Sequence, residues 1–141
     1  SACNTLQGQY TSGPNSVAQK AAEAAYIGDQ SCVETMRLAF DRRMKLVVDL
    51  ARQIPGLKVN EPQGAFYIFP DCSAYIGKSF NGKVIKDSGE LSMYLLEEGH
   101  VACVGGGSFG APDCLRFSYA TSDENLVKAF GWVKDALAKL K

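Results

Sequence analysis

Arg116 is the residue of this chain whose type and position best suit the recognition of an anion. It lies in a strand-like run, Cys114–Ala120, which follows a glycine-rich turn and precedes a helix start. Alternate side chains of a strand share a face, so Arg116 is expected opposite Leu115, Phe117 and Tyr119. A guanidinium held on a strand is a fixed fork of donors that matches a carboxylate or phosphate in two parallel hydrogen bonds. The alternative is an arginine on the solvated face of a sheet, which spacing alone favours.

A second motif, Gly105-Gly106-Gly107-Ser108-Phe109-Gly110, has the spacing of a dinucleotide-binding loop. Such a loop must open into a helix whose amino terminus holds the pyrophosphate, whereas Ala111-Pro112-Asp113 leads here into another strand. The missing helix argues against nucleotide binding. We interpret the motif as a turn whose glycines permit positive φ or close approach by a neighbouring segment.

Residues that could catalyse a reaction are scarce. His100 is the only histidine and lies at a helix-to-strand turn with no evident partner, so we interpret it as a solvated turn residue. The sequence has no outstanding pair of carboxylates, no nucleophile elbow and no spacing typical of metal ligands. Five widely spaced cysteines without a Cys-x-x-Cys pair favour buried free thiols in a reducing compartment. The sequence therefore offers a binding arginine, no catalytic residue and no metal site.

Composition excludes several classes of partner. The chain has 141 residues, enough for one core without disulfides, and 15 basic residues balance 15 acidic ones. This balance gives no basic field for nucleic acid, and the cluster of Arg37, Arg42, Arg43 and Lys45 is interleaved with acidic residues, as in a solvated helix face. No apolar run approaches the roughly 18 residues of a membrane helix, and no secretory signal is evident. We therefore expect a soluble, cytoplasmic protein that binds neither nucleic acid nor membranes.

Periodicity and capping signals predict the elements that position Arg116. We expect an extended arm over 1–13, a helix from a capping box at Ser16–Gln19 to Ile27 and Gly28, and a long helix from about 33 to Pro55-Gly56. Strands over 57–59 and 65–69 should follow, and then a surface loop over 71–87. The last elements expected are a helix over 88–98, strands over 101–104 and around Arg116, and a helix after a capping box at Thr121–Glu124. In the second strand Phe66 and Tyr67 point to opposite faces, so one belongs to the core and the other is available to line a site. This order predicts an α+β fold, a small sheet with helices packed on one side.

Four segments occur in the order known from one protein family: Gln9–Gln19, Ala39–Arg43, Pro62–Tyr67, and Ser108–Gly110 followed by Leu115–Leu126. Together they resemble the carboxy-terminal third of class I pyridoxal-phosphate aminotransferases, in particular bacterial aspartate aminotransferases. The resemblance implies the small domain of fold-type I pyridoxal-phosphate enzymes over residues 31–141. It assigns residues 1–30, an arm and a helix, to the large-domain side.

The resemblance also implies roles for individual residues. In that family the arginine that matches Arg116 grips the α-carboxylate of the amino-acid substrate, and the phenylalanine that matches Phe66 borders the substrate. Glycines around Gly64 and Gly107 let the small domain close over the site.

The family's Schiff-base lysine and most of its phosphate-binding groups precede the segment that matches Gln9, and no lysine of this chain stands in the family's Ser-x-x-Lys context. The resemblance therefore implies a piece of a homodimeric aspartate:2-oxoglutarate aminotransferase that lacks its large domain. Pyridoxal phosphate, an amino acid and a 2-oxo acid would bind the full-length enzyme, and no cofactor is expected on this chain by itself. One alternative is another pyridoxal-phosphate reaction, such as that of a decarboxylase or lyase. A second is a stand-alone carboxylate-binding or dimerisation module without catalytic activity.

Overall fold

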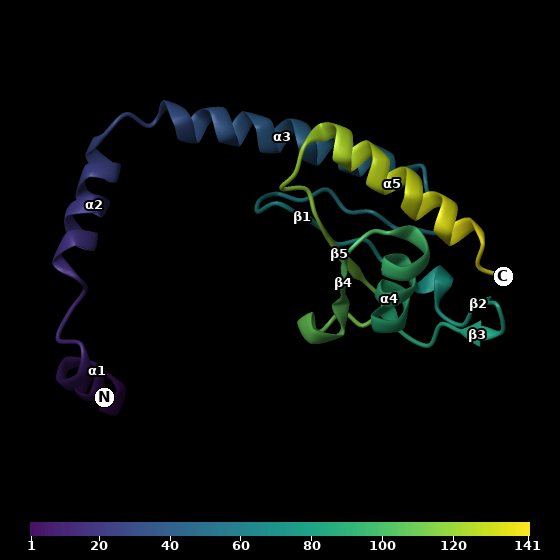
Figure 1. The fold of residues 1–141 in the computed structure, drawn as a ribbon, viewed down its shortest axis with the longest axis horizontal. Helices are drawn as coiled ribbons and strands as arrows, with labels where there is room; N and C mark the ends of the chain where they lie inside the picture. Colours follow the sequence, from purple (N-terminus) through teal and green to yellow (C-terminus); the bar gives the residue numbers. More distant parts are fainter. The chain divides into compact units, whose positions relative to one another are not determined.

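The computed structural model describes all 141 residues, which divide into two compact units, Ser1–Arg37 and Leu38–Lys141. The boundary between these units falls within helix α3. Along the chain, coloured from purple to yellow in Figure 1, the elements are α1 (Ala2–Tyr10), α2 (Ser16–Ile27), α3 (Ser31–Arg52), β1 (Tyr67–Ile68), η1 (Ser73–Tyr75), β2 (Ser79–Phe80), β3 (Lys83–Val84), α4 (Ser88–Gly99), β4 (Val104–Gly105), η2 (Gly106–Phe109), β5 (Leu115–Ser118) and α5 (Asp123–Ala138).

The first unit is helical, and no residue of α1 or α2 is buried. The prediction of an extended arm over 1–13 is wrong for Ala2–Tyr10, which forms α1. Two backbone amides donate to the Ser1 carbonyl at 3.0 and 3.2 Å and begin this helix. The segment contains no proline and a single glycine, Gly8, so its polar residues are compatible with a helix.

Helix α2 has a different cap from the one predicted. Asn15 is the N-cap, and its side-chain oxygen accepts from the amides two and three residues further on, at 2.9 and 3.2 Å. Ser16 is already helical, and Gln19 donates to a preceding backbone carbonyl instead of closing a capping box. Asparagine caps a helix as well as serine does. Asn15 takes the cap in place of Ser16, so α2 starts one residue earlier than predicted. The predicted end at Gly28 is confirmed.

The second unit is built on a three-stranded antiparallel sheet in the order β1-β5-β4. Its strands are shorter than predicted, and the segment 57–59 contributes only an isolated bridge between Lys58 and Asp71. β1 is limited on one side by Ala65, whose φ of 60° is not extended, and on the other by Pro70, which has no amide to donate. Short strands leave most of this sheet's stability to packing on its apolar face.

Strand β5 shows the predicted alternation. Leu115 and Phe117 are buried, whereas Arg116 is half-buried and Ser118 is exposed. The Phe117 ring lies 5.6 Å from a phenylalanine of α5, and Tyr119, buried just beyond the strand, lies 6.3 Å from a phenylalanine of α3. A one-residue slip of β5 would bring Arg116 into this core, so the apolar face fixes the register.

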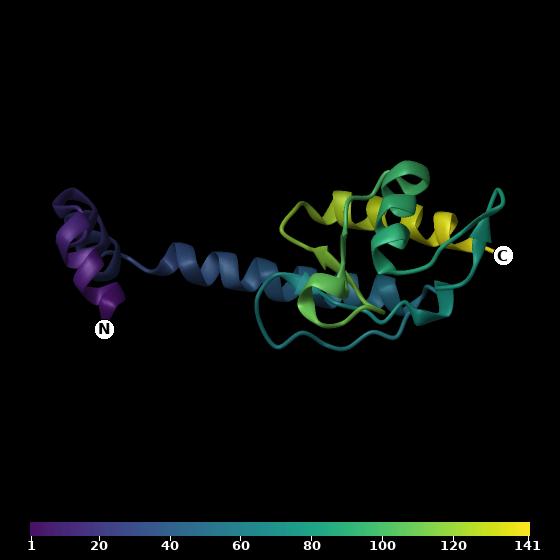
Figure 2. The same ribbon diagram turned by 90° about the horizontal axis from the view of Figure 1, so that it is seen from below.

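The part of α3 that belongs to this unit, residues 38–52, and helix α5 cover that apolar face and run side by side (Figures 1 and 2). α4 packs against α5 and β4. The predicted stripe of α5 is buried at Leu126, Phe130, Val133 and Leu137, and at Leu140 just after the helix. The cap of α5 is Ser122 instead of Thr121, because the Ser122 hydroxyl accepts from the Asn125 amide at 3.3 Å. The predicted fold class, α+β with helices packed against a small sheet, is confirmed.

Two arginines of the predicted basic cluster connect α3 to α5. Arg42 and Arg43 both pair with Asp123 in the first turn of α5, at 2.9 and 3.1 Å. Arg37 and Lys45 pair with acidic residues of their own helix, as a solvated face predicts. The interpretation of the cluster as a solvated face is therefore incomplete, since Asp123 lies far away in the sequence.

The segment 71–87 is folded, which corrects its prediction as a surface loop. It forms the turn η1 and the hairpin β2-β3, whose tip has positive φ at Asn81 and Gly82. Cys72, Tyr75 and Ile85 are buried. These apolar residues stand singly among polar ones without a helical or strand period, so the sequence pattern did not reveal them.

Asp71 provides a pH-dependent contribution to this segment. Hydrogen bonds from Ser73 and an ion pair with Lys58 lower the pKa of Asp71 from 3.8 to about 2. Because the pKa is lower in the folded chain, the carboxylate stabilises the fold above about pH 4 and loses this effect as the pH falls towards 2. We expect Asp71→Asn to reduce the free energy of unfolding at pH 6 and to have a diminishing effect towards pH 2. Denaturant unfolding of both proteins over this range measures the difference, and a difference that is constant with pH would contradict the prediction.

The five cysteines are free, as predicted. Cys72 is buried and Cys103 and Cys114 are half-buried, but Cys3 and Cys32 are exposed, which corrects the prediction that the thiols are buried. The two exposed thiols belong to the helical first unit, in which no side chain of α1 or α2 is buried. No helix has the length and apolar character needed to cross a membrane.

Candidate functional site

The guanidinium of Arg116 lies over two aromatic rings. Its central carbon is 4.5 Å from the ring centroid of Tyr67 and 4.5 Å from that of Phe109. Tyr67 belongs to β1, which pairs with β5, and Phe109 belongs to the turn η2 that precedes β5. The two rings belong to separate aromatic pairs, Tyr67 with Phe66 and Phe109 with Phe69. We call this arrangement of Tyr67, Arg116 and Phe109 the aromatic clamp.

The donors of Arg116 have no partner within the chain. Every other arginine pairs with a carboxylate: Arg37, Arg42, Arg43 and Arg52. Arg116 is half-buried, yet no side chain or backbone carbonyl of the chain accepts a hydrogen bond from it. Its five N–H donors are therefore left for solvent or for a group from outside the chain.

A shallow hollow of about 140 Å³ adjoins Arg116 and is lined by Tyr67, Ala102, Cys103, Val104 and Ser118. The Ser118 oxygen accepts from the Ala120 amide at 3.3 Å, which leaves its hydroxyl proton available to donate. Burial raises the pKa of the Cys103 thiol to about 12, so this thiol is neutral near pH 7. The hollow therefore presents a cation and a hydroxyl donor without a negative charge that would compete for them.

The structure places Phe66 beside the aromatic clamp, and Gly64 lies two residues before it in the chain. The Phe66 ring lies 4.5 Å from that of Tyr67 and 5.9 Å from that of Phe40, and 39% of the residue is exposed. Neither Phe66 nor Tyr67 is buried, so the prediction that one of them belongs to the core is wrong, and Tyr67 is the one that contacts Arg116. Gly64 is exposed, and a Cβ there would meet no atom within 4 Å.

Sequence reasoning missed Phe109, because it interpreted the glycine-rich turn through its glycines and gave its aromatic residue no role. The turn leads into β5, which confirms the predicted order of glycine-rich turn and strand. Gly106 holds the turn: its amide donates to the Cys114 carbonyl at 2.8 Å and to the Ser88 hydroxyl at 3.1 Å. A Cβ at Gly106 would lie 2.1 Å from the Ala111 oxygen, so only glycine fits. The useful signal was an aromatic residue in a turn that enters the arginine-bearing strand.

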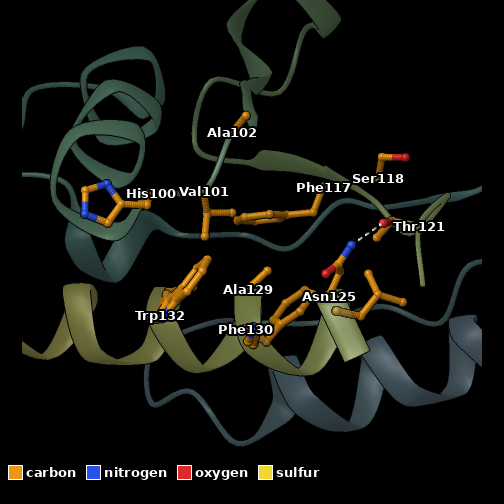
Figure 3. A pocket seen from close by; sticks show the side chains of 13 residues that line it. His100, Val101, Ala102, Phe117, Ser118, Thr121, Asn125, Ala129, Phe130 and Trp132 are labelled. Carbon is orange, nitrogen blue, oxygen red and sulfur yellow. Dashed lines mark hydrogen bonds between the residues drawn. The ribbon is translucent and has the colours of Figure 1, made fainter. Parts of the chain in front are cut away.

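A larger cavity, of about 330 Å³, lies between α5 and the segment around His100 (Figure 3). Its walls are mainly apolar and include Phe117, Phe130 and Trp132. The Asn125 side-chain amide donates to the Thr121 hydroxyl at 3.2 Å on its rim. His100 is exposed at the end of α4, as its interpretation as a solvated turn residue predicts. None of the predicted site residues lines this cavity, so we assign it no role in the candidate site.

Comparison with known proteins identifies the family. The model of the family described as aminotransferase class I and II matches residues 1–131. The chain belongs to this family. An aspartate aminotransferase of Streptomyces avermitilis is 44% identical to this aminotransferase chain over 140 residues, which cover 99% of the chain and 34% of that protein. A bifunctional aspartate aminotransferase and glutamate/aspartate-prephenate aminotransferase of Petunia hybrida is 43% identical over 145 residues, covering 99% and 30%.

The solved structures agree with the sequence comparison. The aspartate aminotransferase of Rhizobium meliloti matches with a TM-score of 0.89 and 39% identity over 97% of this chain and 34% of that chain. This aminotransferase chain therefore spans about a third of the length of the relatives that it matches.

The residues around the hollow at Arg116 do not by themselves fit pyridoxal phosphate, the cofactor that the family implies. No lysine lines the hollow at Arg116, and its walls offer no second cation for a phosphate. No group of three or more histidine, cysteine, aspartate or glutamate residues could hold a metal ion. What the arrangement around Arg116 can do chemically is bind and orient an anion.

Proposed function

We propose that this chain is the substrate-binding small-domain part of a longer aminotransferase that transfers an amino group from aspartate to 2-oxoglutarate. One observation carries the proposal: the guanidinium of Arg116 lies over two rings with all its donors unpaired. A carboxylate is the planar partner that such a fork binds in two parallel hydrogen bonds. Aspartate is favoured over other amino acids because relatives from Streptomyces avermitilis and Geobacillus stearothermophilus are named aspartate aminotransferases.

In this proposal Arg116 binds and orients the amino acid and takes no part in bond making. Holding the α-carboxylate at a fixed point aligns the α-carbon with the reacting groups, which contributes to the rate through orientation. Phe66 borders the substrate with the exposed part of its ring. Gly64 leaves room for the substrate or for a closing domain, since packing within this chain does not require a glycine there.

The large domain, which would hold pyridoxal phosphate, belongs to segments outside this chain. Residues 1–30 would lie on the large-domain side and residues 31–141 would form the small domain of a homodimeric, cytoplasmic enzyme. The first unit supports this assignment because it exposes large apolar side chains that a monomeric protein would normally cover. These side chains are Leu6, Tyr10, Val17, Tyr26 and Ile27.

The complete reading frame around this chain tests the proposal. We expect the longer protein to form oxaloacetate from aspartate in the presence of 2-oxoglutarate, and the 141-residue chain to be inactive. Incubation with pyridoxal phosphate followed by borohydride should add one cofactor mass to the longer protein and label no single lysine of the short chain, because the short chain lacks the phosphate-binding groups. Intact-mass spectrometry measures both.

Two outcomes would contradict the proposal. Stoichiometric labelling of one lysine in the 141-residue chain would show that the chain contains its own cofactor site. A reading frame that begins near Ser1 would favour a stand-alone carboxylate-binding or dimerisation module.

A further inference from the structure

The Arg116 side chain lacks the hydrogen bonds and ion pairs that usually hold an arginine in place. Arginine has several rotatable bonds, so holding its side chain in one conformation costs a large amount of rotamer entropy. Hydrogen bonds and carboxylates hold the other arginines of this chain, but Arg116 has neither. Its close contacts are the two rings of the aromatic clamp.

Both rings are themselves fixed by neighbours. Tyr67 is paired with Ser118 across β1 and β5, and its ring lies 4.5 Å from that of Phe66. The Phe109 ring meets the ring of Phe69 edge to face, with centroids 6.0 Å apart and planes at 89°. The guanidinium therefore links two groups of aromatic rings into one series, which runs Phe40, Phe66, Tyr67, Arg116, Phe109, Phe69.

A ring holds a cation in a different way from a carboxylate. The ring attracts the positive charge through its π-face and accepts no conventional hydrogen bond, so the N–H donors stay free. A carboxylate partner would occupy those donors and compensate the charge that a substrate carboxylate needs. Two aromatic partners restrict the guanidinium and leave its binding edge available.

We infer that Tyr67 and Phe109 are positioning residues, which hold the Arg116 guanidinium ready for a substrate carboxylate. This inference rests on the proposed function of Arg116. Because Tyr67, Arg116 and Phe109 all belong to this chain, the carboxylate site is preorganised before the large domain contributes to it, and less entropy is lost when the substrate binds.

The test uses the full-length holoenzyme with succinate as a competitive inhibitor. We expect Phe109→Leu and Tyr67→Leu each to raise the inhibition constant of succinate about three- to tenfold, with a matching fall in kcat/KM for aspartate. Tyr67→Phe keeps the ring and should retain the inhibition constant of the unmodified enzyme. In the NMR spectrum of the arginine side chains, the Nε–H signal of Arg116 should lose, in each leucine variant, the part of its ring-current shift that the removed ring produces.

Phe80→Leu is the matched control, since Phe80 is a half-buried aromatic residue whose ring makes an edge contact with that of Tyr94 in a different part of the unit. It should leave succinate inhibition unchanged even if it lowers the melting temperature. The inference is overturned if the leucine variants keep the inhibition constant within twofold, or if Phe80→Leu raises it equally. Arg116→Gln separates the two proposals. If Arg116→Gln greatly raises the inhibition constant of succinate and the clamp variants do not, only the inference is refuted. If Arg116→Gln leaves the inhibition constant unchanged, the proposed function is refuted as well.

Discussion

Replacement of Arg116 by lysine is expected to lower kcat/KM for the amino acid by a factor between about ten and a thousand in the full-length enzyme. Removing one partner of a buried charge pair weakens binding by about 2–5 kcal/mol, and lysine recovers only part of this. Lysine keeps the positive charge but is a mobile point charge, and it cannot form two parallel hydrogen bonds to a planar carboxylate. The loss should therefore appear in both binding and alignment of the substrate.

Steady-state kinetics with aspartate and 2-oxoglutarate measure this effect, and the absorbance spectrum of the bound cofactor shows whether cofactor binding is preserved. Arg42→Lys is the matched control, because Arg42 is an exposed arginine that pairs with Asp123 and lies outside the clamp. We expect the control to retain nearly full activity. If Arg116→Lys also retained near-normal kcat/KM, Arg116 would be a solvated strand residue and the site assignment would be wrong.

The second large effect is expected from Gly106→Ala, which should reduce the free energy of unfolding by about 3 kcal/mol. A Cβ at Gly106 would lie 2.1 Å from the Ala111 oxygen and 2.7 Å from the Cys114 oxygen. Both are backbone atoms, so no side-chain rotation relieves the overlap and the turn η2 must move. Because η2 carries Phe109, the substitution should also disturb the aromatic clamp.

Gly107→Ala provides a control within the same turn. A Cβ at Gly107 would meet no atom within 4 Å, so the change in unfolding free energy should stay within about 0.5 kcal/mol. Chemical denaturation of both variants, in whichever form of the protein unfolds reversibly, measures the difference. Equal stabilities of the two variants would show that the close approach at Gly106 does not constrain the turn.

Local patterns in the sequence determined the parts of the fold that depend on one element at a time. The alternation of Leu115, Arg116 and Phe117 follows from strand geometry, and the apolar stripe of α5 follows from the helical period. Together they specify which face of each element is buried, and they place Arg116 on the face opposite the core before any partner is known. The ordered segments that resemble aminotransferases gave the family, because motif order along a chain is a property of the sequence alone.

The sequence did not determine helix starts to the residue or the folding of polar segments. Asn15 and Ser16 are both good caps, and the choice depends on backbone conformation at the junction. The residues 71–87 bury Cys72, Tyr75 and Ile85 singly, and single buried residues leave no period to detect.

Only the tertiary structure decided which residues meet at the site. Arg42 and Asp123 are separated by 81 positions in the chain and form an ion pair because α3 and α5 cover the same face of the sheet. Tyr67 reaches Arg116 because β1 pairs with β5 in one register, and Phe109 reaches it because Gly106 closes the preceding turn. Periodicity states which way a side chain points, but its partner depends on register and turn geometry, which are set by packing between elements distant in sequence. The type of residue 116 thus indicated an anion site, and the fold supplied the two rings that contact its guanidinium and leave its N–H donors free.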